Sequence, residues 1–165
     1  MNLLHQNNVE AAEKLLFLCR EKGITLATAE SCTGGMIGST ITSVPGSSDV
    51  FLGGIISYAN AVKESLLGVS HETLARHGAV SEETAKAMAK GAQKTLGSTI
   101  AVSVTGLAGP GGETPNKPVG LVHFGIATKD YIAHKKQIFS GDRDSIRLQT
   151  VATALAFLEE TINTL

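Results

Sequence analysis

Near the start of the chain, apolar residues recur at the spacing of one helix face. Four of them stand at positions i, i+3, i+4 and i+7: Ala12, Leu15, Leu16 and Cys19. This pattern predicts an amphipathic helix over residues 8–22, which Gly23 then ends. Because Cys19 falls on the apolar face of that helix, we interpret it as a packing residue.

A second pattern, short runs of apolar and β-branched residues, predicts five strands. The runs span residues 24–29, 50–58, 99–105, 119–128 and 131–139. Only Lys129 and Asp130 separate the last two runs, as in a hairpin. Gly53 and Gly54 fall inside the second run, which indicates a bulge or a close approach of another backbone.

Helices are predicted between these strands. Their segments are residues 33–43, 61–67, 82–96 and 142–165. Asn60 and Ser81 are suitable N-caps for the second and third of them, and residues 45–49 form a turn. Helices that alternate with strands, together with one hairpin, indicate a single three-layer α/β/α domain over residues 1–165 with a mixed β-sheet.

The composition narrows the possible partners. Hydrophobic residues make up 42% of the chain and aromatic residues 4%, without any Trp, so Ala, Val, Ile and Leu must build the core. A net charge of −1 gives no electrostatic reason to expect nucleic acid. We find neither a secretory leader nor an apolar run of about 18 residues. Cys19 and Cys32 form neither a metal-type pair nor a disulfide framework. We therefore expect a soluble protein of the reducing cytoplasm, with no metal, no cofactor and no membrane contact.

Three loops that follow apolar strands carry polar groups. They are residues 30–35, 58–63 and 105–117. Ligands of α/β sheets usually bind beyond the strand ends, where helix N-termini point. If the three strands are parallel neighbours, these loops lie at one edge of the sheet and can form one site.

Ser31 lies at a strand-to-helix corner, where a serine is either a nucleophile or an N-cap. The amide N–H groups that follow such a corner can stabilise an oxyanion, whereas an N-cap serine only stabilises the helix. A nucleophilic serine needs a base, commonly histidine. All five histidines lie outside the three loops, so histidine offers no evident base.

Lys63 is the alternative base. It stands in the first turn of a predicted helix, where the helix dipole favours the neutral amine, and burial would lower its pKa further. Tyr58, at the end of the preceding strand, can relay a proton or simply pack there. A solvated lysine is the competing interpretation of Lys63.

Cys32 is a rival nucleophile, since a thiolate at a helix N-terminus has a lowered pKa. A lone cysteine is also a common small packing residue. The third loop supplies Thr105 and bare backbone amides up to Gly112, which can cradle a phosphate or a carboxamide. Arg143 stands at the start of the last helix, where it can bind phosphate or pair with the aspartates that flank it.

Several motifs in register carry a family resemblance. In chain order they are "TAESCTGG", "GGIISYANAVKESLLGV", "HGAVSEETAKAMAKGA", "SVTGLAGPGG" with "KPVG", and "FSGDRDSIR". With them, residues 8–163 resemble the C-terminal domain of the CinA family, the competence-damage-inducible type, which also occurs as a free-standing nicotinamide-nucleotide amidase. We expect no counterpart of the domain that precedes it in longer members.

The resemblance implies hydrolysis of the carboxamide of nicotinamide mononucleotide to nicotinate mononucleotide and ammonia, in pyridine-nucleotide recycling. By that similarity Ser31 corresponds to the nucleophile, Lys63 to its base and Tyr58 to their partner. The expected substrate-binding residues are Glu30, Cys32, Thr33, Gly34, Gly35, Ser48, Thr105, Gly106, Ala108, Gly109 and Arg143.

This chemistry leaves several points open. Lys63 accepts the serine proton directly or through Tyr58, and either residues 33–35 or the Thr105 loop stabilise the oxyanion. Glu30 either orients the amide or holds its loop, and we favour the second role. The alternative function is a non-catalytic pyridine-nucleotide sensor. Helices rich in small residues also make a homo-oligomer possible.

Overall fold

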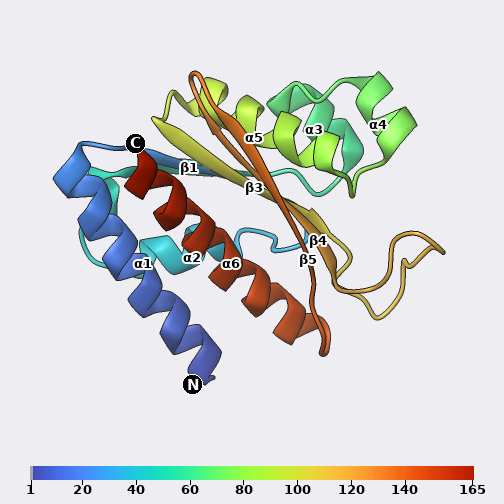
Figure 1. Ribbon diagram of the computed structural model, residues 1–165, viewed down its shortest axis with the longest axis horizontal. Coiled ribbons are helices and arrows are strands. Elements are labelled where there is room, and N and C mark those ends of the chain that lie inside the picture. Colours follow the sequence, from blue (N-terminus) through green and yellow to red (C-terminus); the bar gives the residue numbers. More distant parts are fainter. Residues whose placement is uncertain (1) are drawn as a thin grey trace.

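A five-stranded mixed sheet forms the middle layer of the computed structural model, which describes residues 2–165 (Figure 1). The strands are β1 (Leu26–Glu30), β2 (Phe51–Ile56), β3 (Ile100–Gly106), β4 (Leu121–Thr128) and β5 (Ile132–Ile138). Their order across the sheet is β2-β1-β3-β4-β5. β1 is parallel to β2 and β3, whereas β4 is antiparallel to β3 and β5. The carboxyl ends of β1, β2 and β3 therefore share one edge of the sheet.

Helices cover both faces of this sheet. One face carries α1 (Leu3–Lys22), α2 (Met36–Thr42) and α6 (Arg143–Thr164), and the other carries α3 (Asn60–Leu67), α4 (His71–His77) and α5 (Glu82–Leu96). A short 3-10 helix, η1 (Ser47–Asp49), precedes β2. The predicted three-layer α/β/α domain with a mixed sheet is confirmed.

Alternation along the strands sends side chains of different size to the two faces. Leu26 joins the larger core under α1, α2 and α6, whereas Ala27 and Ala29 face α5. Small residues let α5 approach its neighbours closely. A Cβ added at Gly91 would lie 1.9 Å from the carbonyl oxygen of Leu67, so α3 and α5 can pack this closely only around a glycine.

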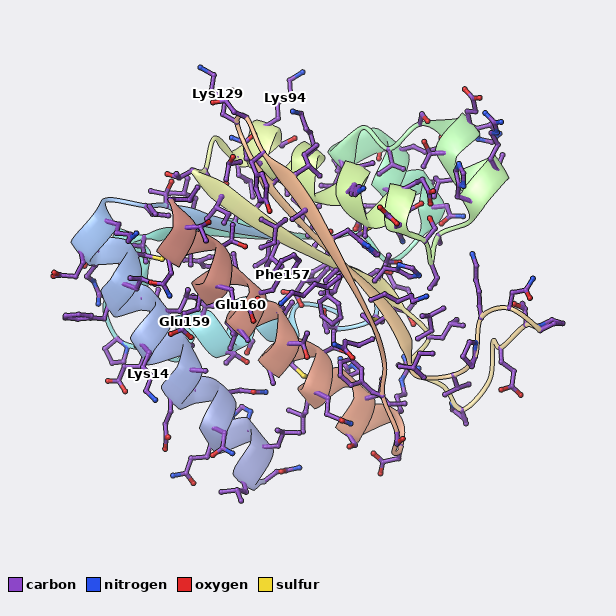
Figure 2. The ribbon with its side chains drawn as sticks, viewed as in Figure 1. Lys14, Lys94, Lys129, Phe157, Glu159 and Glu160 are labelled. Carbon is purple, nitrogen blue, oxygen red and sulfur yellow. The ribbon has the colours of Figure 1, made fainter. Side chains whose placement is uncertain are left out.

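α1 and α6 lie side by side across one face (Figure 1). In Figure 2, Phe157 of α6 lies against the strands, where the Lys135 ammonium sits 4.7 Å from its ring centroid. Lys135 also pairs with Glu160, one turn along the same helix. Among residues 2–165, no helix is both long and apolar enough to cross a bilayer.

The structure corrects three local predictions. α1 begins at Leu3 rather than at residue 8, because the Asn2 side chain caps it by accepting from the Leu4 N–H at 2.9 Å. Asn60 is the first residue of α3 and not its N-cap. α4 was not predicted, since its seven residues are too few to show a helical period.

The predicted irregularity in β2 is confirmed. Leu26 pairs with Phe51 while Ala27 pairs with Gly53, so the register shifts by one residue between them. A Cβ at Gly54 would lie 2.2 Å from Thr28 Oγ1. Gly54 thus allows β1 and β2 to approach closely, just before the strand ends that carry the candidate site.

Candidate active site

Ser31 stands where β1 ends. Its backbone N–H donates to the Val104 carbonyl at 3.1 Å, which extends the contact between β1 and β3 by one residue. Residues 31–35, which we call the Ser31 turn, then lead into α2. Because β1 lies between two parallel neighbours, the loops after β2 and β3 flank this turn. The three loops expected to meet at one edge do so.

A cavity of about 250 Å³ opens where the loops meet. It is lined by Ser31, Cys32, Tyr58, Lys63, Ala79, Val80, residues 105–109, Gly111 and Arg143. Ser31 is 8% exposed, so its hydroxyl is nearly enclosed but borders the cavity.

Lys63 reaches Ser31 from the first turn of α3. The residue is 1% exposed, and its Nζ lies 2.7 Å from the Ser57 carbonyl oxygen, 3.1 Å from the Tyr58 carbonyl oxygen and 3.2 Å from Ser31 Oγ. No carboxylate pairs with it among the described residues. Burial lowers the pKa of the Lys63 amine, since the low-polarity surroundings disfavour the charged form.

The three partners of Lys63 fit an ammonium, which donates to all three oxygens, and they also fit a neutral amine. Such an amine has two N–H groups, which the two carbonyl oxygens accept, and one lone pair. Because carbonyls can only accept, the remaining tetrahedral position faces Ser31 Oγ. The hydroxyl of Ser31 can then donate to the lone pair of Lys63, the hydrogen bond that a serine and its base require.

Tyr58 lies at the rim of the cavity rather than between Ser31 and Lys63. Its backbone carbonyl accepts from Lys63, but its side chain points outward and the residue is 62% exposed. The phenol oxygen lies 3.3 Å from Arg143 Nη2, and Arg143 Nη1 donates to the Gly109 carbonyl at 2.7 Å. Tyr58 and Arg143 therefore bridge two of the loops across the rim.

Glu30 points away from the cavity, into the Ser31 turn. Its carboxylate accepts from the Thr33 hydroxyl at 2.6 Å and from the backbone N–H groups of Gly35, Ile37 and Gly38. Glu30 does not line the cavity. Of the two roles considered for Glu30, the structure shows the hold on the loop.

Thr33, Gly34 and Gly35 belong to the same turn but do not line the cavity. The Gly34 N–H donates to the Ser31 carbonyl at 3.0 Å, and Thr33 and Gly35 bond to Glu30. Ser48 lies in η1, before β2 begins. It is therefore at the amino end of that strand, whereas the cavity lies at the carboxyl ends of the strands.

Cys32 lines the cavity beside Ser31. Burial raises the pKa of its thiol to about 11, and the negative charge of Glu30 contributes in the same direction. No side-chain base bonds to the thiol among the described residues. The expected lowering of its pKa at a helix N-terminus is not found, because burial disfavours the thiolate and the Glu30 carboxylate adds to this effect.

The loop after β3 presents mostly backbone to the cavity. The Thr105 hydroxyl donates to the Ala79 carbonyl at 2.7 Å, so it ties the loop before α5 to β3. Gly106, Ala108 and Gly109 follow along the cavity wall. A Cβ at Gly109 would lie 2.6 Å from a methyl group of Val119, which shows how tightly this loop is folded.

Sequence reasoning missed Arg147 and the loop that contains Ala79 and Val80. Arg147 Nε and Nη2 donate to the carbonyls of Cys32 and Thr33, at 3.1 and 3.0 Å. One signal was available, since positions four apart on a helix share a face. Arg147 therefore follows Arg143 toward the same edge. Ala79 and Val80 offered no such signal.

A larger cavity, of about 650 Å³, lies at the opposite end of the sheet between Ser98, Thr99, Thr128 and Lys129. The Lys22 ammonium on its wall donates to the Ile162 carbonyl. That cavity does not place a buried base against a hydroxyl, so it lacks the chemistry of the Ser31 site. Within residues 2–165, no three His, Cys, Asp or Glu side chains converge as metal ligands.

Comparison with known proteins identifies the family. The model of the CinA C-terminal domain matches residues 8–162. The chain belongs to the CinA C-terminal domain family. Among its relatives, the CinA-like protein of Geobacter sulfurreducens is 49% identical over 158 residues, which is 96% of this chain and 38% of that protein. A putative competence-damage inducible protein of Caldicellulosiruptor saccharolyticus is 49% identical over 94% of this chain and 38% of its own length.

Solved structures of CinA-type proteins share the whole fold. The competence/damage inducible protein CihA of Agrobacterium tumefaciens superposes with a TM-score of 0.93 at 41% identity, over 99% of both chains. The CinA superfamily protein of Klebsiella pneumoniae gives a TM-score of 0.93 at 30% identity, over 96% of this chain and 99% of that one. This CinA domain spans about 38% of the curated relatives it matches.

Proposed function

We propose that this CinA domain is an amidohydrolase that cleaves the carboxamide of nicotinamide mononucleotide to nicotinate mononucleotide and ammonia. The observation that carries the proposal is the position of Lys63 Nζ, buried and 3.2 Å from Ser31 Oγ, with two carbonyls accepting its other hydrogen bonds. A serine with a neutral lysine at this distance has the geometry for acyl transfer.

The reaction proceeds in two stages. Ser31 Oγ attacks the carboxamide carbon while its proton passes to the lone pair of Lys63, so that a tetrahedral oxyanion forms. Lys63 then returns the proton to the departing nitrogen, which leaves as ammonia, and Ser31 carries the acyl group. Water attacks this ester with Lys63 again as the base, and the carboxylic acid and the free serine are released.

The proton moves directly between Ser31 and Lys63. In this structure the Tyr58 phenol bonds to Arg143 and not to either of them, so a relay through Tyr58 is not required. Tyr58 and Arg143 are placed instead to hold the parts of the substrate that extend past the cavity rim. An arginine suits a phosphate there, because its guanidinium presents a planar fork of donors.

The competing thiol mechanism is weaker. Burial raises the pKa of the Cys32 thiol to about 11, so the thiol stays protonated near neutral pH, and within residues 2–165 no side-chain base hydrogen-bonds to it. The choice of nicotinamide mononucleotide as substrate rests on the family resemblance, together with a cationic group at the rim of a cavity that encloses a nucleophile.

The test is ammonia release from nicotinamide mononucleotide, measured without added metal. Wild type and Cys32→Ala should turn over, while Ser31→Ala should be folded and inactive. If no form releases ammonia but the nucleotide still raises the melting temperature, the domain is a nucleotide sensor and the proposal fails. If Cys32→Ala is inactive and Ser31→Ala is active, the nucleophile has been wrongly assigned.

A further inference from the structure

Glu30 is a buried carboxylate bound only by neutral donors. The residue is 2% exposed, and none of the ion pairs among the described residues includes it. Oε2 accepts from the Thr33 hydroxyl at 2.6 Å, from Gly35 N–H at 3.1 Å and from Ile37 N–H at 3.0 Å, while Oε1 accepts from Gly38 N–H at 2.8 Å. An unpaired buried charge is costly unless several hydrogen bonds satisfy it, as these four do.

The same turn is held from its other side by Arg147. Its guanidinium donates to the carbonyls of Cys32 and Thr33, while the Glu30 carboxylate accepts from N–H and O–H groups of residues that follow it in the chain. A negative group therefore holds the donors of the Ser31 turn and a positive group holds its acceptors.

The backbone of Glu30 also reaches the base. Its carbonyl accepts from the Ser57 N–H at 2.8 Å, and the Ser57 carbonyl in turn accepts from Lys63 Nζ at 2.7 Å. Glu30 thus precedes the nucleophile in the chain and fixes the segment that supports the base. A shift at Glu30 would change the distance between Ser31 Oγ and Lys63 Nζ from both sides.

We propose that Glu30 is a positioning residue, whose carboxylate holds the Ser31 turn so that Ser31 Oγ stays within hydrogen-bond reach of Lys63. This inference rests on the proposed function for its catalytic meaning. Glu30 acts through Ser31, and it does not touch the cavity in which the substrate would lie.

The proposal also limits where the oxyanion can bind. The amides of Gly35, Ile37 and Gly38, at the N-terminus of α2, are already taken by Glu30, and the Gly34 amide donates to the Ser31 carbonyl. An oxyanion cannot use donors that a carboxylate occupies. Its donors must therefore come from other groups that line the cavity, such as the backbone of Cys32, of Ala79 and Val80, or of the loop after β3.

Glu30→Gln separates this role from simple space filling. Glutamine has nearly the same shape, but its side-chain NH2 group would face a backbone N–H where the carboxylate now offers an oxygen. At least one of the four bonds is lost whichever way the amide is turned. Leu155→Ala is the matched control, because Leu155 is 1% exposed in the core under α6 and lies outside the candidate site.

The experiment has two readouts on wild type, Glu30→Gln and Leu155→Ala. The first is hydrogen exchange at the amides of Gly35, Ile37 and Gly38, followed by NMR. The second is the rate at which a fluorophosphonate labels Ser31, with ammonia release from nicotinamide mononucleotide measured beside it. In Glu30→Gln we expect the exchange rate at these amides to rise at least tenfold. The rate of Ser31 labelling and kcat should both fall at least tenfold, while KM should change less than threefold. Leu155→Ala should lower the melting temperature without these effects.

Two results would overturn the proposal. One is a folded Glu30→Gln variant in which the fluorophosphonate labels Ser31 at a rate within twofold of wild type. The other is an equal loss of labelling in Leu155→Ala, which would make the effect one of general stability. If Glu30→Gln does not fold, Thr33→Val is tested in its place, since this variant removes one donor to Glu30. Labelling of Ser31 should then fall two- to fivefold, and unchanged labelling would refute the role of Glu30. A wild type that labels but releases no ammonia refutes the substrate and leaves the Glu30 test in force.

Discussion

The lowered pKa of Lys63 predicts a specific link between stability and activity. Its amine titrates below the ordinary lysine value of 10.5 in the folded protein because it is buried, and at about 10.4 in the unfolded chain. Between those two pKa values the unfolded chain binds more protons than the folded one. The free energy of unfolding therefore rises with pH across this window and gains nothing further above the unfolded value.

The size of this effect follows from one proton. While Lys63 is neutral in the fold and charged in the unfolded chain, it contributes up to about 1.4 kcal/mol of stability per pH unit. Lys63→Met removes the amine and keeps a side chain of similar length, so it should remove this slope. Below the window Lys63→Met should be the more stable protein, because wild type then holds a buried charge without a counter-ion.

The assay is urea unfolding of wild type and Lys63→Met at half-unit steps from pH 7 to pH 10. The control is Lys129→Met, which removes a lysine that projects from the opposite end of the sheet, as Figure 2 shows. The difference in unfolding free energy between wild type and Lys63→Met should change with pH, and kcat/KM of wild type should rise over the same range. Parallel pH profiles for all three proteins would refute a neutral buried base at Lys63.

Three further predictions concern other parts of the domain. Arg143→Ala should raise KM for nicotinamide mononucleotide by roughly 10- to 100-fold, the cost of losing a charge-assisted hydrogen bond to phosphate, and should change kcat less. A substrate without phosphate, such as nicotinamide riboside, should show no such rise in KM. An equal rise for both substrates would place Arg143 elsewhere in the mechanism. Burial, and the charge of the nearby His134, lower the pKa of His123 to about 4. The free energy of unfolding should therefore fall by up to about 1.4 kcal/mol per pH unit as the pH drops from about 6.5 toward 4. His123→Gln should reduce this pH dependence in urea unfolding. Gly91→Ala should destabilise the fold by roughly 1–3 kcal/mol, because its Cβ meets the Leu67 carbonyl, and an unchanged melting temperature would show that α3 can move away.

Much of the fold followed from pattern. All five strands lie where β-branched runs predicted them. β1, β3 and β4 are buried under helices on both faces, whereas the edge strands β2 and β5 are partly exposed. The failures were at element ends and in α4, where one capping side chain such as Asn2 or Ser70 decides the boundary.

For the site, the sequence by itself predicted which residues carry the proposed chemistry: a serine after one strand and a lysine after the next, with Arg143 beginning the last helix. Loops that follow parallel strands must end at the same edge of a sheet, so their meeting was also predictable. Only the tertiary structure decided the directions of the side chains. The Glu30 side chain points into the turn, Tyr58 lies at the rim, and Arg147 reaches the Ser31 turn from α6. The physical reason is that a hydrogen bond depends on ångström distances between groups far apart in the chain, which the order of residues does not contain.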